Sequence, residues 1–475
     1  MNRWSKLKFS IFVATIILLL GLTAAIWQQD RLPTLVTALF QKKDLPSIEY
    51  EDQGPTIKVL FDDERSFFDT YGKSFLLRYP NANLEVIKAP AYISQSDYDQ
   101  KVTEIVDKEQ PDVIALNTVT YKKFTDEERL LALDSFIKRD QFPLHAFYPP
   151  VIDSLRVSGD SKLYGLAPKF YASALVYNKD LFDRYGIDYP TDHMSWEEVL
   201  KLAGRFPTEM RNGERIYGYS LANPTISYAF QLIQTIGNTK GLQIADTETG
   251  EMTADTPAWQ AVWEQVLQGY KEGWIYKPEL FDKTKEIRWE DMAAADPFQT
   301  GHAAMSLTSS MAIEMMHYMK KRDKSKNDPF NWNLVTQPVD PNRRNTAFAF
   351  SLDYVYSINA KSVQSQDAWQ LVKYINSAEA AKKLLRNSIH PVTSRTDVPV
   401  GDKEHNYRAF YELPEARNVY ANTGKYAIDY WTIWEAASIE IENVLGEKQT
   451  LQQAMSKLQE KGKEALTRTE EGVPK

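Results

Sequence analysis

The sequence predicts an α/β fold, and two observations along the first part of the chain support this prediction. Residues 56–61, 84–87 and 111–116 are short, mostly apolar runs of the kind found in buried strands. Between them, helical patterns are expected at about 66–79 and 97–109. Strands that alternate with helices in this way indicate βαβ units and a mostly parallel sheet.

A second group of elements is predicted within residues 163–204. The apolar run 174–177 is typical of a buried strand, and Asn178 directly after it is a good N-cap for a short helix. Further on, Ser195 is followed three residues later by Glu198, which is the pattern of a capping box. We therefore expect a strand, a short helix and a second, capped helix in this order.

Elements of the same kinds are expected in the rest of the chain. Thr256 and Pro257 form an N-cap and a first helical residue. The remaining predicted elements are a strand at 301–307, a strand at 351–358, a helix at 365–376 and a helical region that starts near Tyr430.

The composition excludes several classes of protein. The chain has 475 residues, 43% of them hydrophobic and 25% charged, with a net charge of −8, which argues against a nucleic-acid partner. It has no cysteine, so disulfides and thiolate metal sites are impossible. The abundant aromatic residues (11 Trp, 26 Tyr and 21 Phe) fit large cores, and they also fit a site for a ligand with flat apolar faces. The sequence contains no catalytic or cofactor-binding motif such as H-E-x-x-H, G-x-S-x-G or G-x-G-x-x-G, so we expect neither an enzyme nor a cofactor.

The N-terminus resembles an export signal. Arg3, Lys6 and Lys8 precede an uncharged run of 19 residues, 9–27. This length lies between that of a signal peptide, about 7–15 residues, and that of a membrane span, about 20. A cleavage site after Ala25 is available, but we favour an uncleaved anchor with the positive residues in the cytoplasm. Either alternative places the bulk of the chain outside the cytoplasm.

Four segments, in order, resemble the extracellular solute-binding proteins of family 1, the group that contains the maltose-binding proteins. The first is the strand–helix run within 163–204, and the second is Gly301-His302-Ala303-Ala304-Met305, which is similar to a "G-x-A-A-M" strand. The other two are 354–359 with the helix 368–375, and 434–446 with 450–455.

This resemblance implies a two-lobed, periplasmic-binding-protein-like fold of class II with hinge crossings, preceded here by an N-terminal transmembrane helix. It also implies that a small-molecule ligand, a carbohydrate in this group, binds in the cleft between the lobes. The domains expected are 1–27 as anchor, 28–55 as tether, 56–171 plus 357–405 as the first lobe, 172–356 plus 406–467 as the second lobe, and 468–475 as a tail.

Candidate ligand-binding residues on the first lobe follow its strands, because ligands of open α/β sheets bind at the carboxyl ends of the strands. Asp62 and Glu64 follow the first strand, and their carboxylates would accept hydrogen bonds from hydroxyl groups. The alternative is that they supply favourable charge at a helix N-terminus. Asn117 follows the third strand, where it is a candidate ligand or simply a turn residue.

The other candidates belong to the crossing and to the second lobe. Tyr171 lies beside the crossing and is either a ligand contact or a hinge-packing residue. Ser309 and Ser310 begin a helix and are candidates for the site or for helix caps. Trp434 stands where the resemblance implies an aromatic residue that stacks on sugar; the alternative is a buried helix stripe with Trp431.

The function that these features predict is that of an extracytoplasmic solute-binding protein of an ABC importer, which presents a carbohydrate to the permease in the membrane. A membrane-anchored sensor that reports its ligand to a histidine kinase is the alternative, since the same fold serves both roles. An exported glycan-processing enzyme is a third interpretation, which no motif in the sequence supports.

Overall fold

The computed structural model describes residues 54–156, 161–208, 215–221, 229–278, 295–313, 330–348, 350–387, 392–416 and 426–468. Met1–Gly54 form one unit and Pro55–Lys475 another. The expected anchor, 1–27, and nearly all of the expected tether, 28–55, lie outside the described residues. Within those ranges, no helix combines the length and the apolar character that crossing a membrane requires.

The first sheet contains the strands predicted at the start of the chain. In spatial order its members are β2 (Asn83–Lys88), β1 (Thr56–Phe61), β3 (Val113–Leu116), β13 (Val355–Ile358) and β4 (Gly165–Leu166). The pairs β1–β2 and β1–β3 are parallel, as predicted, whereas β13 is antiparallel to both β3 and β4. The sheet is therefore mixed, with a parallel half built from the first sixty residues of this unit.

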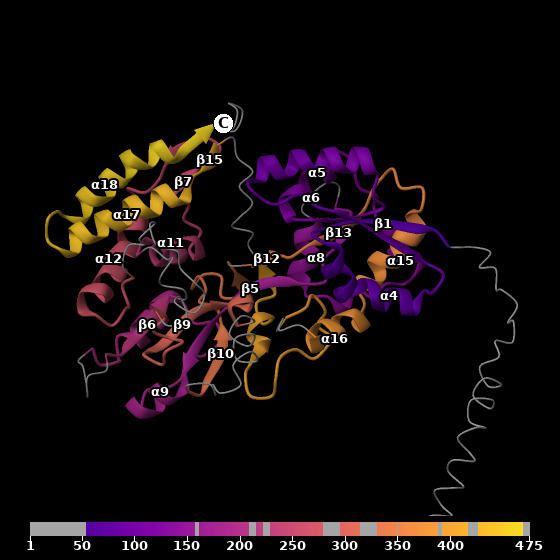
Figure 1. Cartoon of the computed structure of the whole chain (residues 1–475). Helices are drawn as coiled ribbons and strands as arrows, with labels where there is room; N and C mark the ends of the chain where they lie inside the picture. The colour runs from indigo at the N-terminus through magenta and orange to yellow at the C-terminus, as the bar shows by residue number, and fades with distance from the viewer. Residues whose placement is uncertain are drawn as a thin grey trace, which may run out of the picture. The chain divides into compact units, whose positions relative to one another are not determined.

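Helices bury their apolar faces against this sheet, which lies between α5 and α15 in Figure 1. The helix expected at about 66–79 is a continuous helical run with a π-helical turn, Phe68–Gly72, in its middle. The run ends at Arg78, two residues before Pro80. This end is expected, because proline cannot continue a helix. The helices are α3 (Glu64–Phe67), α4 (Lys73–Arg78), α5 (Gln95–Glu109), α6 (Thr118–Asp126), α7 (Asp134–Arg139), α8 (Pro149–Arg156), α15 (Ser365–Ile375) and α16 (Ala378–Asn387).

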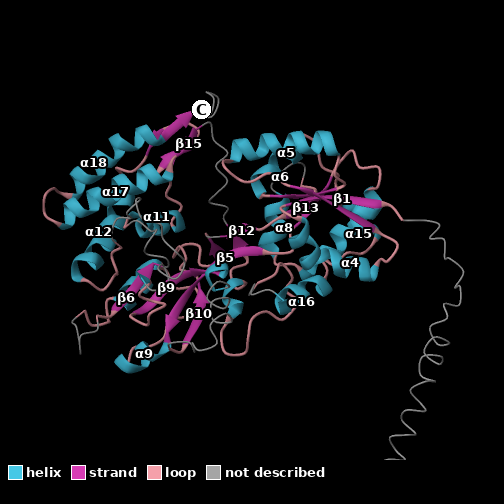
Figure 2. Ribbon diagram, in the orientation of Figure 1, coloured by secondary structure: helices cyan, strands magenta, loops and turns pink. Residues whose placement is uncertain are grey.

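The second sheet is mainly antiparallel, and its strands lie side by side in Figure 2. Its order is β10 (Trp332–Thr336), β5 (Phe170–Asn178), β9 (Ala303–Ser309) and β6 (Tyr217–Leu221), with β12 (Phe350–Leu352) paired to the first part of β5. Only β6 and β9 run parallel within this group.

Three helices of the second lobe begin at the caps predicted from the sequence. Asn178 accepts a hydrogen bond from the backbone of Leu181 at 3.2 Å, and Ser195 and Glu198 form the capping box. Thr256 caps the helix that has Pro257 at its start. The helices are α9 (Lys179–Tyr185), α10 (Trp196–Ala203), α11 (Phe230–Thr239), α12 (Pro257–Glu272), α17 (Tyr430–Leu445) and α18 (Leu451–Lys461).

Short ladders and turns complete the described residues. The ladders are β7 (Ala245–Asp246) with β8 (Glu251–Met252), β11 (Thr346–Ala347) with β14 (Glu415–Ala416), and β15 (Tyr426–Ile428) with β16 (Leu466–Arg468). Three 3₁₀ turns cover Leu144–Ala146, Tyr407–Phe410 and Gly462–Ala465.

Two large apolar cores lie among the described residues: the first covers the first sheet and one face of the second sheet, and the second covers the opposite face of the second sheet. Strand β5 contributes to both of them, because successive side chains of a strand point to opposite faces. Ala174 and Val176 pack into the first core, and Leu175 and Tyr177 pack into the second. The architecture is thus a two-lobed α/β fold in which strands of the second sheet contribute side chains to both cores.

The strand predicted at 351–358 is two strands. β12 ends at Leu352 and pairs with β5, whereas β13 begins at Val355 and joins the first sheet. The uninterrupted pattern of the segment hid this break. Asp353 and Tyr354 lie between the two strands, at the point where the chain passes from one sheet to the other.

Three chain segments pass between the two sheets, and aromatic side chains pack where they meet. The first runs from β4 to β5 and the second from β12 to β13. The third begins near Ser394, whose N–H donates to the carbonyl of Pro168 at 2.9 Å. The ring centroid of Phe170, on the first segment, lies 5.4 Å from Phe350 on the second and 5.3 Å from Tyr411 beyond the third.

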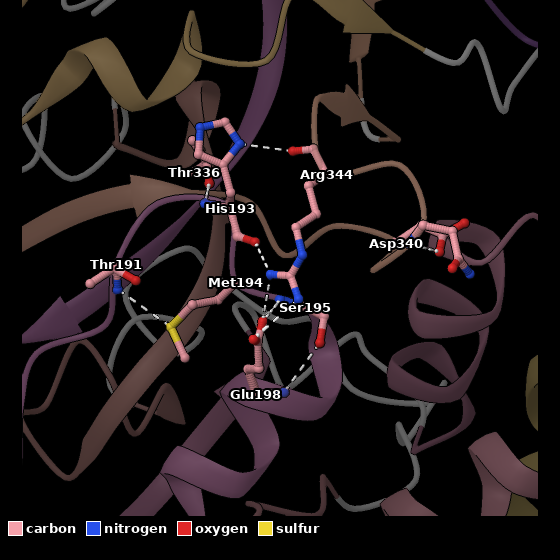
Figure 3. A network of polar contacts seen from close by, with 9 residues as sticks. Thr191, His193, Met194, Ser195, Glu198, Thr336, Asp340 and Arg344 are labelled. Atoms are coloured by element: carbon pink, nitrogen blue, oxygen red, sulfur yellow. Dashed lines mark hydrogen bonds and ion pairs between the residues drawn. The ribbon is translucent and has the colours of Figure 1, made fainter.

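A loop of the second lobe, 340–345, is fastened by polar contacts rather than by a core (Figure 3). The Arg344 guanidinium donates to both carboxylate oxygens of Glu198, at 2.9 and 3.2 Å, and to the carbonyl of His193 at 2.8 Å. His193 has a positive φ of 62°, and its Nδ1 lies 2.8 Å from the Arg344 carbonyl. This set of contacts, which we call the Arg344 network, joins the loop to the capping box of α10.

Candidate functional site

The carboxyl edge of the first sheet brings polar and aromatic side chains together. Asp62 follows β1, Tyr92 follows β2, and Asn117 follows β3. Because β13 is antiparallel to β3, with Val355 opposite Leu116, the residues just before β13 lie at this same edge. Tyr354 is one of them, so four segments distant in sequence meet here.

Asp62 and Tyr354 form the hydrogen bond at the centre of this edge. The Tyr354 hydroxyl lies 2.8 and 2.7 Å from the two carboxylate oxygens of the exposed Asp62. Burial, together with this hydrogen bond and the Asp62 charge, raises the pKa of Tyr354. The hydroxyl therefore remains a donor, and the Asp62 carboxyl oxygens have capacity to accept from further donors.

Aromatic side chains border this carboxylate. Burial, followed by the charges of Asp62 and Asp99, raises the pKa of Tyr98 to about 12. The ring centroid of Tyr92 lies 5.7 Å from that of Tyr98, and Tyr92 is 63% exposed. An exposed tyrosine supported by a buried one offers a flat apolar face beside a hydrogen-bond acceptor.

Tyr171 is held at the crossing by Asp353. The Tyr171 hydroxyl donates to Asp353 Oδ1 at 3.1 Å, and the ammonium of Lys169 lies 2.8 Å from Asp353 Oδ2. The side chains of Lys169 and Asp353 are 14% and 16% exposed. Tyr171 is therefore positioned by an ion pair that is largely shielded from water.

Asn117 and Glu64 occupy the first turns of helices. Asn117 is the N-cap of α6, where its Oδ1 accepts the Thr120 N–H at 2.8 Å and its Nδ2 donates to Gln95 at 3.3 Å. Glu64 is exposed at the start of α3, and the cap of that helix is Asp63. Both positions agree with the capping and helix-charge alternatives, and a role of either residue in ligand binding stays a prediction.

Ser309 ends β9 and Ser310 begins the helix that follows, next to the start of β5. Ser309 lies opposite Ser173 in the ladder, and its hydroxyl accepts the Ala312 N–H at 3.0 Å. The buried hydroxyl of Ser310 accepts the Ala172 N–H at 3.3 Å. These serines therefore stand near Tyr171 along the same strand pair.

Trp434 lies on α17 in the second lobe. Its indole N–H donates to the side chain of Gln234 on α11, and its ring packs at 5.4 Å from that of Trp431. Trp431 is 54% exposed, so the two tryptophans do not form a single buried stripe. The structure thus joins Asp62, Tyr171, Ser309 and Ser310 through the crossing strands, while the contacts of Trp434 belong to the second lobe.

The sequence interpretation missed Tyr92 and gave little weight to Tyr354. A signal for Tyr92 was present, since an aromatic residue follows a predicted strand and lies beside Pro90 and Ile93 in a short loop. For Tyr354 the signal was hidden, because the residue lies inside the run predicted as a single strand.

The arrangement supplies acceptors, hydroxyl donors and aromatic faces. Among the residues that the structure describes, no three histidine, aspartate or glutamate side chains gather as a metal site would require. Such an edge is suited to holding a polar ligand by hydrogen bonds and by ring contacts.

Comparison with known families identifies the class. The model of the family described as "Bacterial extracellular solute-binding protein" matches residues 65–382, which is more than half of the chain. The chain belongs to this family, as the resemblance implied. The family and the similar structures are binding proteins, not enzymes.

Solved structures with low sequence identity share the fold. A sugar transporter from Rhizobium etli in an open conformation gives a TM-score of 0.62 at 18% identity, covering 87% of this chain and 100% of the other. The sugar-binding protein MalE from Xanthomonas citri gives 0.61 at 16% identity, covering 86% and 97%. An ABC substrate-binding protein from Listeria monocytogenes in complex with cycloalternan gives 0.52 at 20% identity, covering 85% and 96%.

Proposed function

We propose that this protein is the extracytoplasmic, carbohydrate-binding component of an ABC importer, which holds a sugar reversibly and presents it to the permease. The observation that carries the proposal is the carboxyl edge of the first sheet, where Tyr354 is hydrogen-bonded to Asp62, and where Tyr98, which is exposed to the Asp62 charge, packs against the ring of Tyr92. Membership of the solute-binding family supports the proposal that this edge is the ligand site.

The chemistry of the edge fits a sugar. Sugar hydroxyls are donors that an exposed carboxylate accepts, and the apolar face of a sugar ring packs on an aromatic ring. Related structures support the same ligand class, since one is described with cycloalternan, one with maltose and one with D-mannitol. In this proposal Tyr171, Ser309, Ser310 and Trp434 contact the ligand from the crossing and from the second lobe.

The proposal places the protein at the outer face of the cell membrane. Its family consists of extracellular proteins, and the basic and apolar N-terminal run of the sequence favours export with a retained anchor. The partner there is the membrane-spanning permease, which receives the sugar after the lobes have enclosed it.

A thermal-shift screen of residues 45–475 tests the function. The panel contains maltotriose, cellobiose, cycloalternan, mannitol, a tripeptide and spermidine. A ligand that binds only the folded state stabilises it by about 2.7 kcal/mol at a hundredfold excess over Kd. We expect a rise in Tm with at least one carbohydrate; a rise with only the peptide or the polyamine contradicts the sugar assignment.

Matched tyrosine variants locate the binding surface. Tyr92→Ala should weaken sugar binding by about 3- to 10-fold, because a stacked ring contributes about 0.5–1.5 kcal/mol. Tyr189→Ala is the control, since Tyr189 is also exposed (38%) and also packs on a second tyrosine, Tyr177, at 5.3 Å, but lies on the second lobe beside α9. Equal losses in the two variants would argue against a site at the first-sheet edge.

A further inference from the structure

Two neighbouring residues, Asp353 and Tyr354, connect the carboxyl edge of the first sheet to the crossing. Tyr354 donates to Asp62 at the end of β1, whereas Asp353 binds Lys169 and Tyr171 at the start of β5. Asp62 is 292 residues away from Tyr354 along the chain, and Tyr171 is 182 residues away from Asp353. A single dipeptide therefore contacts both the ligand-facing edge and the first crossing segment.

The ion pair between Lys169 and Asp353 joins two of the crossing segments. Lys169 lies between β4 of the first sheet and β5 of the second, and Asp353 lies between β12 and β13. The backbone repeats the connection, since the Asp353 N–H donates to the Lys169 carbonyl at 3.3 Å and Leu352 lies opposite Phe170 in the ladder. A rotation of one sheet against the other must therefore change the backbone or the contacts of these crossing residues.

Both oxygens of the Asp353 carboxylate are already used within the protein. Oδ1 accepts from Tyr171 and Oδ2 faces the Lys169 ammonium. The charge of Asp353 also contributes, after burial, to the raised pKa values of the buried Tyr71 and Tyr356. Asp353 thus faces the protein interior, and its contacts make it a group that orients neighbours.

We propose that Asp353 is a positioning residue that fixes the angle between the two lobes through Lys169 and, through Tyr171, couples that angle to ligand capture at Asp62 and Tyr354. Loss of its charge releases the ion pair between the crossing segments, so the lobes sample a wider range of angles. It also weakens the hydrogen bond that holds the Tyr171 side chain, because a neutral amide oxygen is a weaker acceptor than a carboxylate, so Tyr171 is less ordered before ligand binds. The part that concerns ligand rests on the proposed function, whereas the part that concerns the angle does not.

Spin labels measure the angle directly. The chain has no cysteine, so Gln100→Cys on α5 and Glu264→Cys on α12, both exposed, give two unique labelling sites, one in each lobe. The full chain is labelled, in mild detergent, and the distance between the labels is recorded by pulsed electron paramagnetic resonance without ligand. Asp353→Asn keeps the shape of the side chain and an acceptor for Tyr171, but it removes the charge.

A second ion pair of the same chemistry provides the control. Lys373 and Asp140 lie 2.7 Å apart with exposures of 29% and 16%, and both belong to the first lobe, away from the crossing segments. We expect Asp353→Asn and Lys169→Met to broaden the distance distribution, and Lys169→Arg, which keeps the pair, to resemble the wild type. Asp140→Asn should leave the distribution unchanged.

Affinity supplies a second readout, with the carbohydrate of the screening panel that gives the largest thermal shift. Asp353→Asn and Tyr171→Phe should raise Kd by about 3- to 10-fold, as expected for the loss of about one net hydrogen bond. Only Asp353→Asn should also broaden the ligand-free distribution. An unchanged distribution in both Asp353→Asn and Lys169→Met, or equal broadening in Asp140→Asn, overturns the proposal. Absence of sugar binding by the wild type contradicts the proposed function instead. The distances between the spin labels then still test whether Asp353 fixes the angle between the lobes.

Discussion

The contacts around Asp353 and the Arg344 network each pair a basic side chain with a carboxylate, but they serve different purposes. Each has one basic side chain paired to one carboxylate, with backbone hydrogen bonds on both sides. The Arg344 and Glu198 side chains are 44% and 45% exposed and fasten a loop within the second lobe, whereas Lys169 and Asp353 are shielded and join two crossing segments. The difference teaches that the burial of an ion pair and the segments that it joins decide what the pair does.

Lys169→Met is the strongest way to test this comparison. It removes the cation and leaves the Asp353 carboxylate only 16% exposed without its ion partner. Breaking a buried pair from one side costs about 3–5 kcal/mol, so we expect a loss of about 2–4 kcal/mol for this nearly buried pair, measured by urea unfolding followed by circular dichroism. A loss below that of Arg344→Met would show that burial does not separate the two networks.

Arg344→Met should have a smaller effect, of about 0.2–1 kcal/mol, because exposed ion pairs contribute little. The capping box between Ser195 and Glu198 remains intact in this variant, so α10 keeps its N-terminus. The change should appear mainly as faster amide hydrogen exchange in residues 340–346, with β5 and β9 unaffected. Exchange that accelerates throughout the second sheet would contradict the local role.

The pH dependence of stability sharpens the same contrast. The Arg344 guanidinium, followed by the Ser195 N–H, lowers the pKa of Glu198 from its ordinary value of 4.5. A carboxylate with a depressed folded-state pKa contributes stability that is present above about pH 4.5 and is lost as the pH falls through the folded-state value. The stability of Arg344→Met should therefore approach that of the wild type on acidification, as urea unfolding between about pH 7 and pH 3.5 would reveal. A constant difference across this range would exclude the charge as its cause.

The smallest effect is expected for Glu64→Gln. The Glu64 side chain is exposed at the first turn of α3, and exposed substitutions of this kind usually change stability by less than about 0.5 kcal/mol. If Glu64 contacts ligand, Kd rises while the unfolding curve stays in place. An unchanged Kd leaves it as a helix-terminal charge alone.

Local patterns were sufficient for much of the fold. The caps at Asn178, Ser195 and Thr256 are short-range interactions, and the structure has each of them where the sequence predicts it. The break after Leu352 was not predictable, because it depends on β12 and β13 finding partners in two different sheets. Neighbouring residues in the sequence contain no information about these partners.

The site shows the same division. Asp62 was predicted as an acceptor from its place after a strand, but its donor, Tyr354, lies 292 residues away. Tyr171 was placed at the crossing by its neighbours, whereas the ion pair that holds it depends on Asp353, 182 residues further on. What the sequence lacked was the pairing of distant segments, which only the folded chain provides.

The position of β13 also determines when the first lobe is finished during synthesis. Among the described residues, strand β4 pairs in the first sheet with β13 alone, which lies between it and β3. The ribosome must therefore deliver residue 358 before a sheet whose first strand begins at residue 56 can close. For some three hundred residues of translation the growing chain carries an unfinished sheet edge, which is the period in which a chaperone or the export machinery would find it unfolded.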